Sequence, residues 1–369
     1  MIKGLKNLFN IFIFLIVILT ILISFLAMIL DMNSMKVSLN EGFVPTYESN
    51  LVNFRNVSLS NEPRVIFCNE SSPCLNNFID FLNKAHSEIL CSFYDLKNKE
   101  IIDTLDKKSN YLNISLILDN RNLNRKELKK LNFNKIKLYS DINRNTVYDN
   151  YIHHKFCIVD NSLLLTGSAN PTNNGLLKND NLIFIINSSE LASNYVNEFN
   201  QLASGIYGYN KIPNRNFHKI NFSYKNTSFI LESYMCPQNN CEEVITTILD
   251  NAEIEILFVS YVLTQDEIED IFMQRNNEII IRGVIEKKLV EVKSSEVLNL
   301  MNYIDILLYT KSNNMHHKFF VIDEKIVIFG SLNPSNSGTS FNDENMIIIR
   351  SNSVAKLFKK EFNRLYYNG

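Results

Sequence analysis

The chain has 369 residues, of which 46% are hydrophobic, so it can form two ordinary domains or one large duplicated domain. Its 37 lysines and arginines nearly balance its 39 aspartates and glutamates. No global positive field would therefore attract nucleic acid, although a local basic groove would be enough to bind it.

The first predicted element is a membrane-spanning helix at residues 9–30, from Phe9 to Leu30. This stretch is almost entirely apolar and would extend about 33 Å as a helix, enough for a bilayer core. A cleaved signal peptide is the alternative, but its apolar region would be shorter. Lys3 and Lys6 precede the span and Asp31 follows it. The positive-inside tendency thus predicts a single-pass membrane protein with an extracytoplasmic catalytic part.

After the anchor the chain is polar and then repeats itself. AHSEILCSFY, starting at Ala85, is echoed by AEIEILFVSY at Ala252, and HHKFCIVD at His153 is echoed by HHKFFVID at His316. The landmarks keep their order, which predicts a duplicated unit. The predicted segments are a cytoplasmic stub and anchor at 1–31, a tether at 32–62, a first repeat at 63–204, a linker at 205–228 and a second repeat at 229–369.

Each copy has the pattern of strands alternating with helices, followed by a pair of strands around the HHK segment, one more strand and a closing helix. In the second copy the strand candidates are IEILFVSYV, EIIIRGVIE, IDILLYT, HHKFFVID, KIVIFGS and MIIIR. Such short runs of Ile and Val are typical of strands buried on both faces. Helices at 241–252, 265–275 and 352–366 would cover them. Each half is therefore predicted to be an α/β sandwich.

Both repeats carry six identical residues at identical spacing. They are His153, Lys155, Asp160, Gly167, Ser168 and Asn170 in the first, and His316, Lys318, Asp323, Gly330, Ser331 and Asn333 in the second. A histidine and a lysine two apart on a strand point to the same face. Two such sets facing each other would surround a tetrahedral phosphate with lysines and asparagines, with one histidine on each side of phosphorus. An in-line displacement needs this arrangement.

The spacing resembles the HxK(x4)D(x6)GSxN signature of the phospholipase D superfamily, and the resemblance covers nearly everything after the tether. It implies two tandem PLD-like α/β sandwich repeats related by pseudo-twofold symmetry, and a phosphodiesterase that needs no metal or other cofactor. It also implies a covalent phosphohistidine that water hydrolyses. His153 would be the nucleophile and His316 the general acid, although the symmetry of the motifs leaves that order open. The residues expected to hold the phosphate are Lys155, Lys318, Asn170, Asn333, Ser168 and Ser331.

A histidine nucleophile needs a carboxylate partner that keeps a proton on its other ring nitrogen. In the superfamily this acid lies some 25 to 30 residues after the histidine. Asp180 follows His153 by 27 residues and Glu344 follows His316 by 28, inside the matching strings NDNLIFII and NDENMIII. We expect both acids to orient a catalytic histidine.

Other motif positions are predicted to be structural. Asp160 and Asp323 lie at strand ends, where an aspartate often caps a turn. Gly167 and Gly330 would serve the tight turn of each GSxN segment. The middle histidines of the HHK segments, His154 and His317, point to the opposite strand face and are expected in the core.

The six cysteines fall into two classes. Two pairs at equivalent places of the repeats are spaced to close small local disulfides in an oxidising exterior, namely Cys68 with Cys74 and Cys236 with Cys241. A zinc site is the weaker alternative, because the spacings differ from CxxC and no histidine lies close by. Cys91 and Cys157 fall inside apolar runs and are predicted to be buried thiols.

The motif does not discriminate among the substrates of the superfamily. The anchor and the absence of a basic charge excess slightly favour hydrolysis of a phospholipid. An endonuclease acting on DNA or RNA is the alternative, because the HHKFxVID and GSxNP segments also resemble those of small bacterial endonucleases. A cardiolipin-synthase-like phosphatidyl transferase would carry two N-terminal spans. A non-catalytic, membrane-tethered binding protein would have lost a histidine or lysine. The expected partners are a phosphodiester and the membrane, and the expected state is a monomer.

Overall fold

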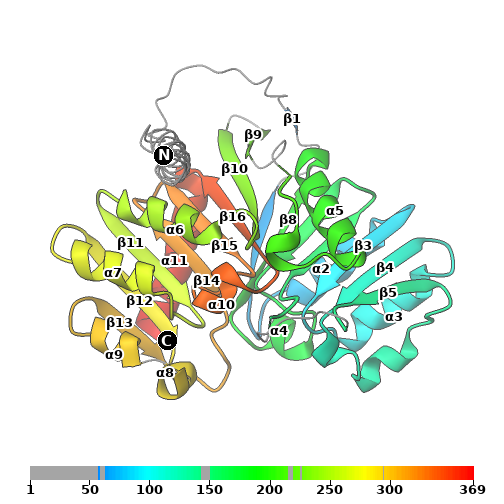
Figure 1. Ribbon diagram of the computed structural model, residues 1–369, viewed down its shortest axis with the longest axis horizontal. Coiled ribbons are helices and arrows are strands. Elements are labelled where there is room, and N and C mark those ends of the chain that lie inside the picture. The colour runs from blue at the N-terminus through cyan, green and yellow to red at the C-terminus, as the bar shows by residue number, and fades with distance from the viewer. Residues whose placement is uncertain (1–56, 59–62, 143–149, 215–218, 225–226, 294) are drawn as a thin grey trace, which may run out of the picture. The chain divides into compact units, whose positions relative to one another are not determined.

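The computed structural model describes residues 57–58, 63–142, 150–214, 219–224, 227–293 and 295–369, and Phe54–Gly369 forms one compact unit (Figure 1). The predicted anchor at residues 9–30 lies outside the described residues, as does the predicted tether except for residues 57–58. Within the described residues, no helix combines the length and apolar character needed to cross a membrane. The anchor and the limits drawn for the tether, linker and repeats stay predictions.

The first half of the described chain builds a seven-stranded mixed sheet with the order β2-β8-β7-β6-β3-β4-β5. Its strands are β2 (Arg64–Cys68), β3 (Glu88–Phe93), β4 (Asn113–Leu118), β5 (Ile136–Ser140), β6 (Lys155–Val159), β7 (Leu163–Gly167) and β8 (Asn181–Asn187). β3, β4 and β5 pair in parallel, and β6 joins β3 antiparallel. Every residue of β6 and β7 is buried, because both faces of the sheet are covered.

The second half repeats this arrangement in a nine-stranded sheet with the order β1-β9-β10-β16-β15-β14-β11-β12-β13 among the described residues. Its strands are β1 (Val57–Ser58), β9 (Lys219–Tyr224), β10 (Thr227–Cys236), β11 (Glu255–Ser260), β12 (Ile280–Glu286), β13 (Asp305–Tyr309), β14 (Lys318–Ile322), β15 (Ile326–Gly330) and β16 (Glu344–Arg350). From β10 to β13 the order matches the first sheet strand for strand. This mixed α/β fold with two sheets is consistent with tandem repeats.

Helices cover both faces of each sheet. The first half has α2 (Cys74–Asn83), α3 (Lys99–Lys108), α4 (Asn173–Leu177), α5 (Ser189–Ala203) and the 3-10 turns η1 (Asn120–Asn122) and η2 (Lys126–Lys130). The rest of the chain has η3 (Gly208–Asn210), α6 (Cys241–Asp250), α7 (Asp266–Arg275), α8 (Lys287–Lys293), α9 (Ser295–Leu300), α10 (Asn336–Ser340) and α11 (Asn352–Asn368). Side-chain caps begin several of them; for example, Ser188 accepts a hydrogen bond from the Leu191 N–H at the start of α5.

Three hydrophobic cores follow from this layering. One lies under α2 and α3 and includes Phe78, and a second lies under α6 and α7 and includes Phe272. The third contains residues of α5 and α11, such as Phe199 and Phe358, together with strand residues of both sheets. The two halves therefore share one continuous apolar core, which fixes the strands that carry the HHK motifs, β6 and β14, relative to each other.

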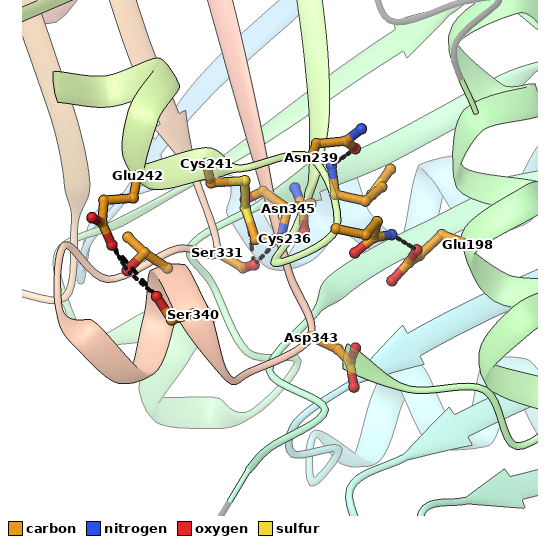
Figure 2. Close-up of a disulfide and its surroundings, with 12 residues drawn as sticks. Glu198, Cys236, Asn239, Cys241, Glu242, Ser331, Ser340, Asp343 and Asn345 are labelled. Atoms are coloured by element: carbon orange, nitrogen blue, oxygen red, sulfur yellow. Dashed lines mark hydrogen bonds between the residues drawn. A yellow bond between two sulfur atoms is a disulfide. The ribbon is translucent and has the colours of Figure 1, made fainter. Parts of the chain in front are cut away.

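Three disulfides occur among the described residues. Cys68–Cys74 and Cys236–Cys241 each join the end of a strand to the start of the next helix, and Figure 2 shows the second of these. The third joins Cys91 to Cys157, which the sequence analysis took for buried thiols. That interpretation was wrong because it lacked the strand register: the two residues are direct partners on β3 and β6, with their Cα atoms 4.1 Å apart. The equivalent pair in the second half is Phe258 and Phe320.

Candidate active site

The two motif histidines stand at equivalent positions, each just before a central strand. Lys155 begins β6 and Lys318 begins β14, so His153 and His316 lie two residues ahead of them. The backbone N–H of His153 donates to the carbonyl of Asp343 (2.9 Å). The N–H of His316 donates in turn to the carbonyl of Asp180 (2.8 Å). Each histidine is thus held by the other half of the chain, and the two motifs build a single site.

Each motif histidine also has a side-chain partner from the opposite half. His153 Nδ1 lies 2.6 Å from Oε1 of Glu344, the first residue of β16. His316 Nδ1 lies 2.8 Å from Oδ1 of Asn181, the first residue of β8. The Asn181 amide is oriented by its Nδ2, which donates to the carbonyl of Gly175 (3.0 Å). Each ring thus turns Nδ1 toward an oxygen acceptor, a contact that favours the tautomer with its proton on Nδ1 and leaves Nε2 for chemistry.

The two halves differ in the chemistry of these partners, since one is a carboxylate and the other an amide. The expectation that Asp180 orients a histidine does not agree with the position of its side chain. Its carboxylate accepts a hydrogen bond from the Tyr309 hydroxyl (2.5 Å) and pairs with Arg364. Equal counting from each histidine gives the correct match, since Asn181 and Glu344 each follow their histidine by 28 residues; in the strings NDN and NDE, Asp180 corresponds to Asp343 and Asn181 to Glu344.

The two motif lysines are buried and influence each other's charge. Lys155 is 1% exposed and Lys318 is 2% exposed, and each ammonium donates to the carbonyl of the histidine two residues earlier. Burial lowers the pKa of Lys155 to about 7, against the opposing charge of Glu344. Burial, and then the charge on Lys155, lower the pKa of Lys318 well below its ordinary range. A bound anion would stabilise both ammonium groups, so the electrostatics of the site favour a negatively charged ligand.

Burial and the two lysines also lower the pKa of both motif histidines. Burial, and then Lys155 and Lys318, hold the pKa of His153 well below its ordinary range. Burial and the same two lysines also lower the pKa of His316, and Lys318 Nζ lies 3.1 Å from its Nδ1. Burial raises the pKa of Glu344 to about 7. Near neutral pH the free site therefore holds an uncharged imidazole beside a carboxyl group, Glu344, that titrates close to pH 7.

The GSxN turns follow β7 and β15 and lie against the strands that carry the orienting residues. Asn170 and Asn333 each bury a side-chain Oδ1 that has no hydrogen-bond partner within the described residues. Gly167 and Gly330 allow the close approach, because a Cβ on either would lie 2.3 Å or 2.2 Å from a backbone oxygen of the neighbouring strand. The turns thus leave one buried amide oxygen in each repeat free to accept a hydrogen bond.

The motif serines are used inside the sheets. Ser168 Oγ accepts from the Leu182 N–H (3.0 Å) and donates to Asn181 Oδ1 (3.0 Å). Ser331 Oγ accepts from the Asn345 N–H (2.9 Å). Both hydroxyls are buried, so they support the strands of the orienting residues, a different role from the predicted contact with phosphate.

The motif aspartates lie at the ends of β6 and β14 that are far from the histidines. Asp160 follows β6 and accepts from the backbone N–H groups of His86, Ser87 and Glu88 at 2.8 to 2.9 Å. Asp323 follows β14 and accepts from three N–H groups in the same way, over residues 253–255. Each aspartate closes the turn before a neighbouring strand, which agrees with the structural role expected for it.

The middle histidines of the HHK segments are buried behind the site in two equivalent charge networks. His154 Nε2 lies 2.8 Å from Glu198, and His317 Nε2 lies 3.1 Å from Glu361. Lys211 then joins Glu198 to Asp343, and Arg364 joins Glu361 to Asp180. Glu198 and Asp343, labelled in Figure 2, come from different halves. Sequence reasoning missed Lys211 and Arg364, because nothing in the motif spacing marks them.

Two tyrosines beside the site were also missed. The Tyr94 and His153 rings lie 5.1 Å apart, and the Tyr261 and His316 rings 4.5 Å apart, between centroids. Lys155 and Lys318 lie 5.6 and 5.2 Å from the same tyrosine rings. The signal was present in the sequence, since both tyrosines end the repeated strings AHSEILCSFY and AEIEILFVSY.

No group of three or more His, Cys, Asp or Glu side chains is placed to hold a metal ion within the part of the chain that the structure describes. Two of the disulfide cysteines, at the ends of β2 and β10, lie beside the orienting residues: Cys68 is the register partner of Asn181, and Cys236 that of Glu344. These covalent links fasten the strands next to both orienting groups.

Comparison with known proteins places this site in a family. The mitochondrial cardiolipin hydrolase of Mus musculus is 40% identical over 52 residues, which are 14% of this chain and 24% of that protein. The chain thus spans about a quarter of the length of this curated relative. The crystal structure of phosphatidylserine synthase from Haemophilus influenzae Rd KW20 superposes with a TM-score of 0.63 at 14% identity, covering 86% of this chain and 89% of that chain.

Polyphosphate kinase from Porphyromonas gingivalis shares the fold as well, with a TM-score of 0.59 at 9% identity over 82% of this chain and 50% of that chain. At such identities the similarity establishes the fold alone. The family model described as "Cardiolipin synthase, PLD-like domain" matches residues 78–203 and 245–366. These two matches cover about two thirds of the chain and contain both motifs, and the chain therefore belongs to the PLD-like domain family of the cardiolipin synthases.

Proposed function

We propose that the protein is a phosphodiesterase that cleaves its substrate through a covalent phosphohistidine on His153. The observation that supports this most strongly is the pairing of His153 with Glu344 across the two halves, next to two buried lysines. An imidazole with a carboxylate on Nδ1 is a nucleophile at Nε2. With a phosphate anion bound, which stabilises both ammonium groups, the lysines provide positive charge for the transition state.

In the first step, Nε2 of His153 attacks phosphorus, a P–N bond forms and the P–O bond to the leaving alcohol breaks. His316 gives its Nε2 proton to the departing oxygen. In the second step, His316 takes a proton from water as the water oxygen attacks phosphorus, and the P–N electron pair returns to His153. The products are an alcohol and a phosphomonoester, and both histidines regain their starting states.

The difference between Glu344 and Asn181 supports this assignment of roles. The phosphorylated imidazole is a cation for the lifetime of the intermediate, and a carboxylate on Nδ1 stabilises it. A general acid must instead release a proton readily, and an amide partner leaves an imidazolium more acidic than a carboxylate would. His153 therefore suits the nucleophile and His316 the acid.

The bound substrate completes the charge balance. In the free site the pKa of His316 is lowered by burial and by the two lysines, so the ring is uncharged. A phosphodiester anion next to Lys155 and Lys318 offsets the positive charge of the lysines and the burial of His316. It therefore raises the pKa of His316 and favours its protonated form. His316 is thus protonated, and able to act as the acid, mainly when substrate is bound. Asn170 and Asn333 are proposed to donate from Nδ2 to the remaining phosphate oxygens, and their unpaired Oδ1 atoms to accept from the attacking water.

Phospholipid is the proposed substrate class. The matching family model is described by cardiolipin synthase, and the curated relative by its name acts on cardiolipin. The near-balanced charge of the chain gives no support for a polyanion. The apolar segment at residues 9–30 is proposed to anchor the protein in a membrane, which would hold the site close to lipid diesters.

The test uses the full chain in detergent or nanodiscs, with EDTA present, and the variants His153→Ala and His316→Ala. The substrates are labelled phosphatidylglycerol and cardiolipin in vesicles, and labelled single-stranded DNA and RNA. Lipid cleavage by the wild type and its loss in both variants would support the proposal. Cleavage of nucleic acid alone would replace lipid by the nuclease alternative. Wild-type activity in the His153→Ala variant would refute the mechanism.

A further inference from the structure

A carboxylate outside the motif holds the backbone that leads into the first histidine. Asp119 directly follows β4 and is fully buried. Its Oδ2 accepts from the N–H of Ile152 (3.0 Å), the residue immediately before His153. Its Oδ1 accepts from the N–H of Arg121 (3.1 Å). Both oxygens are thus used by backbone donors, one of them adjacent to the proposed nucleophile.

The second half has the same device with a longer side chain. Glu286 ends β12 and is 1% exposed. Its Oε2 accepts from the N–H of Met315 (2.8 Å), the residue immediately before His316. Its Oε1 accepts from the N–H of Lys288 (3.3 Å), two residues along the chain, as in the first half.

These hydrogen bonds complete the fixation of each histidine. Ile152 and Met315 are 0% exposed, and each forms a bridge to the other half of the chain, with Asp343 and Asp180 respectively. The next N–H, that of His153 or His316, donates to the carbonyl of that same bridging residue. Two successive peptide units are therefore tied, the first by the buried carboxylate and the second by the opposite repeat.

The burial of these carboxylates has a cost that their hydrogen bonds offset only in part. Burial, and then Asp141, raise the pKa of Asp119 to about 6, while the Arg121 guanidinium lies 3.6 Å away and opposes the rise. Burial also raises the pKa of Glu286. A neutral side chain would cost less free energy to bury, so an acid at both equivalent positions indicates a specific role.

We propose that Asp119 and Glu286 are positioning residues. Each fixes the peptide before one catalytic histidine and so determines the position and direction of its Nε2. The inference rests on the proposed function, because it assigns the two carboxylates to its two separate steps. Asp119 serves the nucleophile, and Glu286 serves the acid. Displacement of a reacting group by about 1 Å is enough to slow a reaction by about 100-fold.

Amide isosteres test this with almost no change in shape. Each carboxylate accepts two N–H groups, whereas Asn or Gln has one accepting oxygen and turns an NH₂ toward the other donor. The variants are Asp119→Asn and Glu286→Gln in the full chain. Their matched controls are Asp160→Asn and Asp323→Asn, which lose the same kind of bond at the far end of the same catalytic strands.

Leaving-group chemistry separates the two roles. The probes are phosphatidyl-p-nitrophenol, whose leaving group needs no acid, and phosphatidylglycerol, whose leaving group does. If the wild type cleaves only nucleic acid, thymidine 5′-p-nitrophenyl phosphate and a dinucleotide take their place. Asp119→Asn should lower kcat about 10- to 100-fold on both probes, with KM within about twofold. On phosphatidyl-p-nitrophenol, Glu286→Gln should release one equivalent of p-nitrophenol at the wild-type rate and then turn over slowly. On phosphatidylglycerol, the same variant should be slow from the first turnover.

Fold loss is monitored by urea unfolding, and the variants Asp119→Glu and Glu286→Asp should recover part of the lost kcat by restoring two acceptors. The proposal is overturned if the two amide variants keep the kcat of their controls, or if kcat falls only with the folded fraction. It also falls if both variants respond alike to the leaving group. If instead His153→Ala matches the wild type, the proposed function fails first and the positioning roles fail with it.

Discussion

Oε1 of Glu344 lies 2.6 Å from Nδ1 of His153, although the two residues belong to different halves of the chain. The reciprocal contact, between His316 and Asn181, is an amide contact. The duplicated fold thus brings together two equivalent histidines in unequal surroundings. This inequality distinguishes the two histidines chemically, which the symmetric motifs alone do not, and two predictions depend on it.

Replacement of Glu344 by Gln should keep the contact to His153 but remove its charge. The phosphoimidazolium then loses its counter-charge, and we expect kcat to fall about 100-fold or more with little change in KM. The pKa of Glu344 is raised to about 7, so the wild-type rate should fall as pH drops through about 7 and the carboxylate is protonated. Glu344→Gln should lack this acidic limb. Pre-steady-state release of p-nitrophenol across pH 5 to 9 measures both effects, and an unchanged acidic limb would contradict them.

Replacement of Asn181 by Asp gives the second half the carboxylate of the first. The new charge beside Nδ1 should raise the pKa of His316 and make it a weaker acid. We therefore expect the pH at which kcat falls to half on the basic side to move upward. The maximum kcat should also be lower on phosphatidylglycerol, whose leaving group needs an acid, than on phosphatidyl-p-nitrophenol. Asn181→Ser serves as the control that removes the amide without adding charge. If Asn181→Asp leaves the pH profile of the wild type unchanged, His316 is not the acid.

Much of this arrangement could be predicted from the sequence, because motif spacing and strand patterns are local. The histidines, the lysines, the asparagines and the α/β class all follow from period and repetition. Glu344 was found as an orienting residue, but Asp180 was chosen one position away from Asn181. A residue-by-residue alignment of the repeats matches Glu344 with Asn181, but the expectation of an acidic partner favoured Asp180 instead.

Contacts between residues far apart in the chain were the least predictable, because they depend on how the strands pack. Asp119 and Glu286 contact residues 33 and 29 positions away, and Lys211 reaches an acid from each half. The Cys91–Cys157 disulfide depends on the register of two strands 66 positions apart. Pairings at such separations are fixed by tertiary packing, which single-sequence patterns do not encode.

Asp160 should matter for stability and not for chemistry. Burial works against its charge, but hydrogen bonds from Glu88, Ser87 and His86 lower its pKa to about 2. Because the folded pKa lies below the ordinary value, the stabilisation is present above about pH 4 and is lost as pH falls toward 2. Asp160→Asn should reduce the free energy of unfolding by about 1 kcal/mol at pH 7, leave kcat unchanged, and lose its difference from the wild type near pH 2. Urea unfolding at several pH values checks this, and a large drop in kcat of the folded variant would contradict it.

Lys211 should be one of the most sensitive positions outside the site. Its side chain is fully buried and joins Glu198 to Asp343, so Lys211→Met leaves two buried acids without their shared cation. Loss of one partner of a buried ion pair costs about 3 to 5 kcal/mol, and we expect the free energy of unfolding to fall by that amount at pH 7. Burial opposes the charge of Glu198, but Lys211 and His154 lower its pKa to about 2. The wild-type advantage should therefore shrink as pH falls from about 4.5 toward 2, where Glu198 is protonated.

Arg364→Met is the matched control for Lys211→Met. Arg364 bridges the equivalent acids Glu361 and Asp180, but its side chain is 36% exposed, so water can solvate the remaining charges. Its loss should cost clearly less than the loss of Lys211. Urea unfolding of both variants at pH 7 and pH 4 measures the difference. Equal costs would mean that burial does not set the strength of these networks. A cost for Lys211→Met that is the same at both pH values would mean that Glu198 and Asp343 are not the groups left uncompensated.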